Sequence, residues 1–247
     1  MAIAFEQLRI EPAYRQVATA LLERITDRSL KTGDRLPSEN ELARQFGVNR
    51  STVREALREL QSSGVLGRER GSKLMTVTRP APRKVGEDVS RALHLHDASA
   101  FDVWEGLTIV EPAIAERAAE RRSEADLLRL QAAAAEFRGS NRAAGAAAER
   151  VSEYFRALAS AAANPVLELA QEPLVRLLQP SLAIMINKVS QARERIAAAQ
   201  ERIATAVEAR NSDQAREWMA KHIRDFRRGY ELAGIDLERP VAIATRR

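Results

Sequence analysis

The chain has 247 residues, of which 45% are hydrophobic, 30% charged and only 4% aromatic. This length allows two domains of ordinary size, and the low aromatic share with abundant Ala favours helices over a β-sandwich. The absence of Cys excludes disulfides and thiolate metal sites. Only three His are present, His94, His96 and His222, which leaves little for any metal site.

The charge is unevenly distributed along the chain, which carries a formal +5 at pH 7. Residues 1–80 hold 14 Lys and Arg against 10 Asp and Glu (+4), whereas the remaining 167 residues hold 25 against 24 (+1). The excess in the first third favours an acidic partner there. No apolar run approaches the roughly 20 residues that span a bilayer, and the start lacks a signal-peptide pattern. We therefore expect a cytoplasmic protein with no membrane partner.

Residues 12–64 show the pattern of three helices. The first is predicted over 12–29 and is entered through Pro12, with apolar side chains at helical spacing. The second begins at a Ser-x-x-Glu capping box, Ser38 and Glu41, and ends at Gly47. The third begins after Asn49 and ends at Gly64. The apolar side chains of the first helix are Tyr14, Val17, Leu21, Leu22 and Ile25. The positions expected to be buried in the other two are Leu42, Phe46, Val53, Ala56, Leu57 and Leu60.

Short strand-like runs at 65–68 and 73–78 follow, on either side of the turn "ERGS". Three helices and a hairpin are the plan of a winged helix-turn-helix, so we assign residues 1–80 to such a domain. The stretch "RPAPRK" contains turn and charge signals without periodicity, and it predicts a linker over 81–85.

The rest of the chain, 86–235, predicts an all-α bundle, with a tail over 236–247. Ser123 with Asp126 indicates one helix start, Asn164 before Pro165 another, and Asn211 or Ser212 the last. The fold class is thus mainly α, a winged helix-turn-helix followed by a helical bundle. The helices are expected at about 86–95, 99–121, 123–138, 147–162, 165–178, 181–209 and 212–232.

The segment "NRSTVRE" opens the third helix, the one that enters the major groove in a helix-turn-helix. Arg50 and Arg54 lie one turn apart, with Ser51 between them, on a flank that the apolar stripe leaves free. Arg can pair with guanine through two hydrogen bonds, and Ser or Thr can contact a base or a phosphate. Arg44, and Arg70 or Lys73 in the hairpin, are placed to neutralise phosphates. A solvated charged helix face is the alternative interpretation of these arginines.

The N-terminal residues resemble GntR-type bacterial transcription factors, most specifically in "GDRLPSENELA" and "GVNRSTVREALREL". The segments "VEPAIAERAAE", "RALASAAANPVL" and "NSDQAREWMAKHIRDF" are similar to the helical effector domain of the FadR/FCD subgroup, so the resemblance spans about residues 10–232. Asn40 departs from the family pattern, in which Arg is common at this position. Carried over by position, the resemblance implies DNA contacts at Asn40, Arg44, Asn49, Arg50, Ser51, Thr52, Arg54, Arg70 and Gly71.

The resemblance also implies an effector pocket, but with altered chemistry. Most FCD domains hold a divalent metal through an Asp and three His, near an Arg that receives an effector carboxylate. Here the four ligand positions read Val151, Phe155, Gln200 and His222, and the Arg position reads Leu107. One imidazole and one amide cannot hold such a metal against water. We therefore expect no metal and no cofactor, and a pocket at these five positions for an apolar or amphipathic effector.

The histidines allow other interpretations. His222 is either a buried side chain satisfied by a hydrogen bond or a residue that contacts the ligand. His94 and His96 could form an exposed metal site with Asp97, although an H-x-H pair on a helix points its rings apart, so ordinary surface is preferred.

Three functions remain open at this point. The favoured one is a dimeric regulator that binds a short palindrome in double-stranded DNA and a small-molecule effector. By resemblance it is expected to repress a metabolic operon, since repression is the commoner mode in the family. A DNA-binding factor that has lost effector sensing is the second. The third is an enzyme with a winged helix for docking, which the lack of a nucleophile motif or acid/base cluster disfavours.

Overall fold

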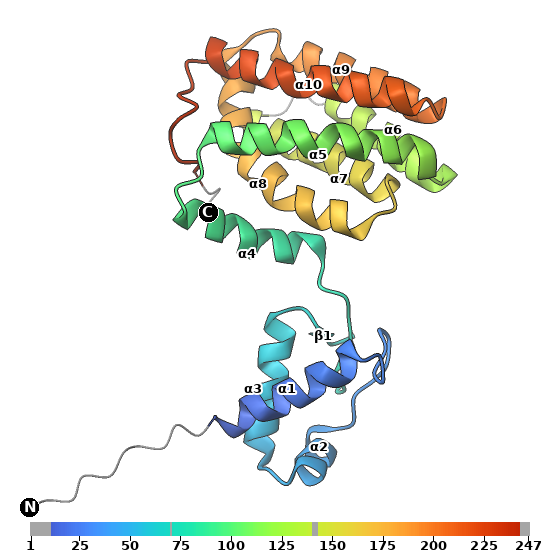
Figure 1. Cartoon of the computed structure of the whole chain (residues 1–247), viewed down its shortest axis with the longest axis vertical. Helices are drawn as coiled ribbons and strands as arrows, with labels where there is room; N and C mark the ends of the chain where they lie inside the picture. The colour runs from blue at the N-terminus through green and yellow to red at the C-terminus, as the bar shows by residue number, and fades with distance from the viewer. Residues whose placement is uncertain (1–10, 70, 140–142, 243–247) are drawn as a thin grey trace, which may run out of the picture. The chain divides into compact units, whose positions relative to one another are not determined.

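The computed structural model describes residues 11–69, 71–139 and 143–242. The chain divides into two compact units after Lys84, and each is described by itself (Figure 1). Among the described residues, no helix is both long and apolar enough to cross a membrane.

The first unit contains the helices of the predicted helix-turn-helix, with the hairpin after them. Leu66 pairs with Val77 and Gly67 with Thr76, in antiparallel register. The elements are α1 (Ala13–Thr26), α2 (Glu39–Phe46), α3 (Arg50–Ser62), β1 (Leu66–Gly67) and β2 (Thr76–Val77).

The turn between α2 and α3 follows from its local residues. The Ser38 hydroxyl accepts a hydrogen bond from the Glu41 amide and so caps α2, although the Glu41 side chain accepts one from Gln45 instead of closing the capping box. Gly47 ends α2 with φ 65°, in the left-handed region that favours glycine. Asn49 precedes α3 in extended backbone, but its side chain makes no capping bond. Asn49 therefore occupies the predicted N-cap position but does not form the capping hydrogen bond.

The hairpin, residues 65–78 and here called the wing, is shorter in strands than the sequence predicts. The connector before α2 stabilises it, because the Leu36 amide donates to the Met75 carbonyl at 2.8 Å and the Gly33 amide to the Val77 carbonyl at 2.9 Å. Leu36 is 1% exposed and joins the core that the α3 stripe forms. Phe46, predicted to be buried, is only partly buried, as are Tyr14 and Ile25 on α1, and Leu22 of the same apolar stripe is 42% exposed.

The second unit is a bundle of helices around one core, as predicted. In Figure 1, α5 and α10 run side by side, and α7 and α8 lie next to them. The helices are α4 (Pro82–Leu95), α5 (Ala100–Arg121), α6 (Glu124–Arg138), α7 (Ala144–Ala161), α8 (Pro165–Lys188), α9 (Ala192–Glu208) and α10 (Ser212–Leu232).

The predicted break between two helices near Pro180 is wrong. Pro180, like Pro173, lies inside α8, and the chain leaves the helix at Val189, whose backbone is extended. Proline removes one hydrogen bond from a helix interior, but the leucines on either side of Pro180 are fully buried, so packing outweighs that cost.

Three predicted helix starts are capped in the structure as expected, whereas α4 and α7 begin earlier than predicted, at Pro82 and Ala144, and α9 begins only at Ala192. Ser123 and Asp126 form a complete capping box at α6, Asn164 caps α8 with Pro165 in its first turn, and Asn211 caps α10. The predicted tail, as far as it is described, packs on the bundle, because the Val241 amide donates to the Ala98 carbonyl at 2.9 Å.

Candidate nucleic-acid interface and effector-domain core

The predicted DNA-contacting residues gather at the turn between α2 and α3. Asn49, Arg50 and Ser51 are exposed at the start of α3, and Thr52 and Arg54 are partly exposed on its next turn. Asn40 and Arg44 are exposed on α2. Gly71 is exposed in the wing with φ 85°, which favours glycine, and Arg70 lies outside the described residues.

A glutamate that the sequence analysis did not single out joins the two arginines. Oε2 of Glu39 accepts from Nε of Arg50 at 2.8 Å and from Nη2 of Arg54 at 3.0 Å. Nε of Arg54 lies 3.3 Å from the same oxygen. Hydrogen bonds from Arg54 and then Arg50 hold the pKa of the Glu39 carboxyl below its usual range. The contact joins residues 11 and 15 positions apart, so no local pattern could have indicated it.

Arg44 has a different environment. Its guanidinium pairs with Glu41 one turn earlier on α2, and its side chain is 75% exposed. Such exposed pairs contribute little, and a phosphate can replace the carboxylate at small cost. Arg44 therefore suits a phosphate contact, whereas Arg50 and Arg54 have fixed orientations.

The five positions of the predicted effector pocket lie in the core of the second unit. Leu107, Val151, Phe155 and Gln200 are fully buried, and His222 is 2% exposed. The rings of Phe155 and His222 stack with centroids 6.0 Å apart. The structure thus brings α7 and α10 together at two of these positions, with four of the five fully buried and His222 nearly so.

Two of these core residues carry polar atoms without a partner among the described residues. They are Nε2 of His222 and both side-chain polar atoms of Gln200. The interpretation of His222 as a satisfied core histidine therefore does not hold for Nε2. Burial lowers the pKa of His222 to about 4, so the ring is neutral at neutral pH. An unpaired buried polar group costs about 1–3 kcal/mol, which a ligand could recover by pairing with it.

A buried carboxyl group in the same core was missed by the sequence analysis. Oε1 of Glu111 accepts from Nε2 of Gln171 at 2.9 Å, and Nε2 also donates to the Phe155 carbonyl. Burial raises the pKa of Glu111 to about 8. The signal was present, because Glu111 shares a helix face with Leu107 and Ile114 and is the one carboxyl within the apolar run "LTIVEPAIA".

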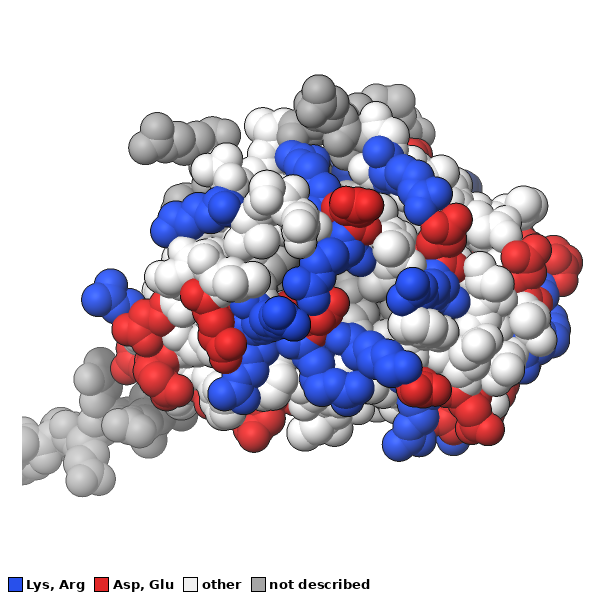
Figure 2. All heavy atoms as spheres, turned by 90° about the horizontal axis from the view of Figure 1, so that it is seen from above, with Lys and Arg blue, Asp and Glu red and all other residues white. Residues whose placement is uncertain are grey.

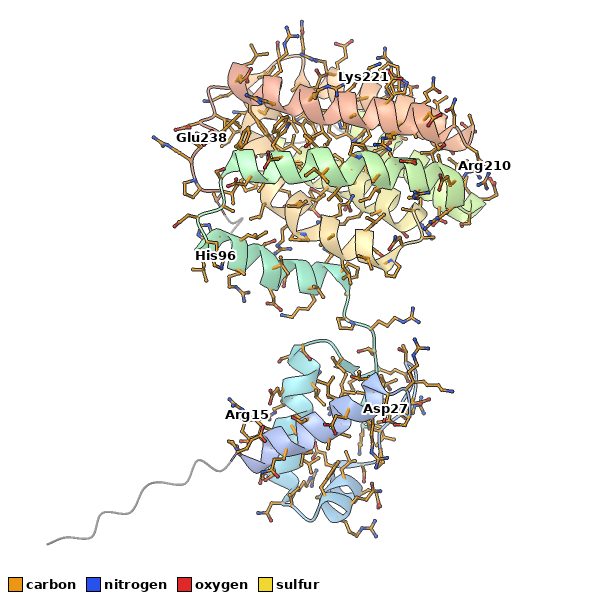
Figure 3. All side chains as sticks on the ribbon, in the orientation of Figure 1. Arg15, Asp27, His96, Arg210, Lys221 and Glu238 are labelled. Carbon is orange, nitrogen blue, oxygen red and sulfur yellow. The ribbon has the colours of Figure 1, made fainter. Side chains whose placement is uncertain are left out.

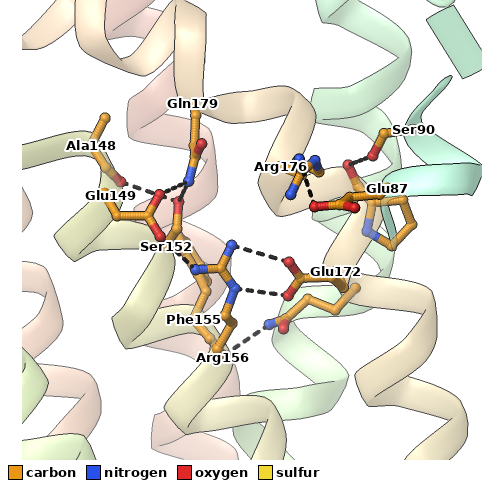
Figure 4. Close-up of polar contacts among 12 residues, drawn as sticks. Glu87, Ser90, Ala148, Glu149, Ser152, Phe155, Arg156, Glu172, Arg176 and Gln179 are labelled. Carbon is orange, nitrogen blue, oxygen red and sulfur yellow. Dashed lines mark hydrogen bonds and ion pairs between the residues drawn. The ribbon is translucent and has the colours of Figure 1, made fainter. Parts of the chain in front are cut away.

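A second polar network links α7 and α8, and further contacts join α8 to α4 (Figure 4). Arg156 donates to Glu172 through Nε at 2.8 Å and Nη2 at 3.0 Å, and the Glu172 side chain is 2% exposed. On α4, the Ser90 hydroxyl donates to the Pro173 carbonyl, and Glu87 pairs with Arg176. A methyl group on Gly86 would lie 2.5 Å from Cγ of Glu172, so α4 approaches α8 closely only because this residue is glycine.

The donor set does not fit the metal that the FCD resemblance implies. Val151 and Phe155 supply no donor atom, which leaves one imidazole and one amide. In the part of the chain that the structure describes, no group of three or more His, Asp or Glu could hold a metal ion. Nδ1 of His94 lies 2.8 Å from the Val241 carbonyl, and His96 lies in the turn after α4 (Figure 3).

The second unit also has a face rich in Lys and Arg, seen over α9 and α10 in Figure 2. Many of these cations are paired there: Arg195 with Asp225 at 2.7 Å, Lys221 with Glu217 at 2.7 Å, and Arg216 with Glu116 at 2.9 Å. These ion pairs agree with the near-zero net charge of residues 81–247, so this face is a poor candidate for a DNA-binding surface.

The fold and these two sites define a winged helix-turn-helix protein with a helical second domain. Residues 13–74 match the family of bacterial regulatory proteins called the gntR family, and residues 102–225 match the FCD domain. The chain is 32% identical to the HTH-type transcriptional regulator LutR of Bacillus subtilis (strain 168) over 204 residues, which are 81% of this chain and 92% of LutR. It is 29% identical to the Exu regulon transcriptional regulator of Escherichia coli (strain K12) over 126 residues, 51% of this chain and 48% of that protein.

A solved structure, Streptococcus agalactiae GntR, has a TM-score of 0.61 and 26% identity, over 87% of this chain and 99% of that one. The chain is therefore a transcription regulator and not an enzyme. It belongs to the GntR family and carries an FCD domain, which confirms the resemblance and the fold class predicted from the sequence.

Proposed function

We propose that this regulator binds a short palindrome in double-stranded DNA as a homodimer and represses a metabolic operon in the cytoplasm. The observation that carries the proposal is the exposed start of α3, where Arg50 and Arg54 are held side by side. Repression is supported by a relative, the mannosyl-D-glycerate transport/metabolism system repressor MngR of Escherichia coli (strain K12). That protein is 47% identical over 62 residues, 25% of this chain and 26% of its own.

Two arginine substitutions test the DNA interface. Arg54→Ala should lose about 1–3 kcal/mol of binding free energy on the cognate site and little on scrambled DNA, because it removes a base contact. Arg44→Ala should weaken binding to both DNAs alike and lower the slope of affinity against salt, because it removes a phosphate contact. Gel-shift titrations on both DNAs at several salt concentrations measure this. If Arg54→Ala bound both DNAs as the wild-type protein does, the assignment of α3 as the helix that contacts bases would be wrong.

We further propose that the helical domain binds a small apolar or amphipathic effector without a metal. Val151, Phe155 and Leu107 provide apolar surface, and Gln200 and His222 provide unpaired polar atoms for the polar end. A bare carboxylate among these apolar side chains would cost several kcal/mol. A surface hollow of about 320 Å³ between α9 and α10 includes His222 in its lining.

Elemental analysis of protein purified without chelator tests metal independence. We expect no stoichiometric Zn²⁺, Mn²⁺ or Ni²⁺, no thermal shift on adding Zn²⁺ or Ni²⁺, and no change in DNA binding with EDTA. One metal ion per chain in the bundle would show that the positions assigned to the ligands are wrong.

The loss of effector sensing is the second candidate, and the complete burial of the five core positions favours it. A thermal-shift screen of acyl chains and hydrophobic ring compounds separates the two, because a sensor should gain stability with one class. Mapping the genomic binding sites would identify the regulated genes.

A further inference from the structure

Glu39 lies where a DNA-binding surface should not carry an acid. It is the first residue of α2, and its carboxylate contacts the two arginines that the proposed function assigns to base reading. A carboxylate close to phosphates lowers the affinity for DNA by repulsion. Its presence therefore calls for a compensating role.

The geometry shows what the carboxylate does to each arginine. Arg50 uses only its Nε–H on Glu39, so both Nη groups remain available as a pair of donors. Arg54 uses Nε and one Nη2 hydrogen, so Nη1 and the other Nη2 hydrogen remain. Each guanidinium can still present two donors to a guanine edge, which needs two.

The Glu39 carboxylate is more buried than the two guanidinium groups that it contacts. The Glu39 side chain is 22% exposed, while those of Arg50 and Arg54 are 59% and 44% exposed. The carboxylate thus lies below the guanidinium groups, and the two arginines extend past it to solvent. The Glu41–Arg44 pair differs, because there a single arginine pairs with an acid that is 36% exposed, and its own side chain is 75% exposed.

Fixing the arginines favours base reading over phosphate binding. An Arg side chain loses rotamer entropy when it is immobilised, and Glu39 has already restricted both arginines. Binding to base edges can retain the contacts with Glu39. Binding of the same arginines to phosphates would break them and leave a half-buried carboxylate unpaired next to DNA, which disfavours non-specific complexes.

We propose that Glu39 is a positioning residue for sequence readout: it directs Arg50 and Arg54 to base edges and disfavours their release to phosphates. This rests on the proposed DNA-binding function and names the group that sets its specificity. The relevant quantity is the ratio of specific to non-specific affinity, and not the affinity alone.

The test compares Glu39→Gln, Glu39→Asp and Glu55→Gln with the wild-type protein. In vitro selection with the wild-type protein first supplies the cognate duplex, and fluorescence anisotropy then measures its binding and that of a scrambled duplex across a salt series. Glu55 is the matched control, because it is an exposed acid on α3 whose removal changes the charge equally. Circular dichroism confirms that each variant is folded.

Glu39→Gln should lower the specificity ratio by roughly tenfold or more, equivalent to about 1.4 kcal/mol, while scrambled DNA is bound more tightly. Its binding should also become more salt-dependent as the arginines turn to phosphates. Glu55→Gln should tighten both complexes and leave the ratio unchanged. Glu39→Asp keeps the charge but is too short to reach both arginines, so it should resemble Glu39→Gln.

A ratio within twofold of wild type in Glu39→Gln, or a wild-type ratio in Glu39→Asp, would overturn the positioning role. Identical ratios in Glu39→Gln and Glu55→Gln would do so as well. If selection with the wild-type protein gives no motif, the proposed DNA-binding function itself fails, so the two failures are distinguishable.

Discussion

At the scale of single residues, two ionisable side chains lie in surroundings that disfavour their charged forms. Glu111 and His222 are both buried in the helical domain, one as an acid and one as a base, and burial shifts their pKa values in opposite directions. Each is neutral over part of the physiological range. Their titration therefore changes the free energy of unfolding, with opposite signs.

Stability should fall between pH 6.5 and 8, and Glu111 should be the cause. Its pKa rises from 4.5 to about 8 on folding, so its stabilising contribution is complete below pH 4.5 and is lost as pH rises through 8. The pKa of His222 falls from 6.5 to about 4, so its contribution is complete above pH 6.5 and is lost toward pH 4. Above pH 6.5 only the Glu111 effect remains, and over 1.5 pH units it amounts to about 2 kcal/mol.

Urea denaturation at pH 6.5, 7.25 and 8 measures this loss in the wild-type protein and in Glu111→Gln. The amide keeps an acceptor for Gln171 and cannot ionise, so its unfolding free energy should stay level. Glu55→Gln, on the exposed side of α3, should keep the wild-type slope. A wild-type protein that is equally stable at pH 6.5 and 8 would contradict the neutral state of Glu111.

At this scale the sequence could predict which arginines lie exposed at the start of α3, because helix spacing fixes the face on which each residue lies. It could not predict Glu39 as their partner, since that contact depends on how α2 crosses α3. The burial of Glu111 could have been predicted, because helix spacing places it on the same face as Leu107. The sequence could not predict that the polar atoms of Gln200 lack a partner in the described part of the chain, because this depends on every helix that surrounds the side chain.

Among the elements, the starts of helices were more predictable than their ends. A cap is a local signal, and Ser123, Asn164 and Asn211 all cap as predicted. The end of α8 is decided by packing, because Leu182 and Met185 after Pro180 are buried against the bundle. The start of α4 at Pro82, earlier than the predicted 86, also had no strong cap to mark it.

The attachment of α4 to α8 depends on Gly86, and two glycine substitutions test it. Gly→Ala normally stabilises a helix by about 0.5–1 kcal/mol. Gly145, in the first turn of α7, has open space around it, so Gly145→Ala should show this gain. Gly86→Ala places Cβ 2.5 Å from Cγ of Glu172, which Arg156 holds in place.

Gly86→Ala should therefore lower the unfolding free energy by about 1–3 kcal/mol, as overpacking does elsewhere. Chemical denaturation of both variants gives the comparison. If Gly86→Ala is as stable as Gly145→Ala, α4 does not pack on α8 as the structure shows.

At the scale of the whole molecule, specificity calls for two chains on one DNA site. The proposed base contacts at the start of α3 are few, chiefly those of Arg50 and Arg54, and a good two-donor contact gives about 1–3 kcal/mol of discrimination. Specific regulators bind their sites about 4–10 kcal/mol more tightly than other DNA. One helix-turn-helix falls short of this range, and twofold symmetry doubles the number of contacts on a palindrome.

Sedimentation velocity with a labelled duplex should accordingly show two chains on the selected palindrome. A duplex with one half-site scrambled should bind far more weakly, because it loses one set of base contacts. Inserting 5 base pairs between the half-sites turns one of them by about half a helical turn, to the opposite face of the DNA, and should abolish the tight complex. The same duplex with 5 base pairs added outside the site serves as the control. Tight binding of a single chain to one half-site, or indifference to the insertion, would contradict recognition by a symmetric dimer.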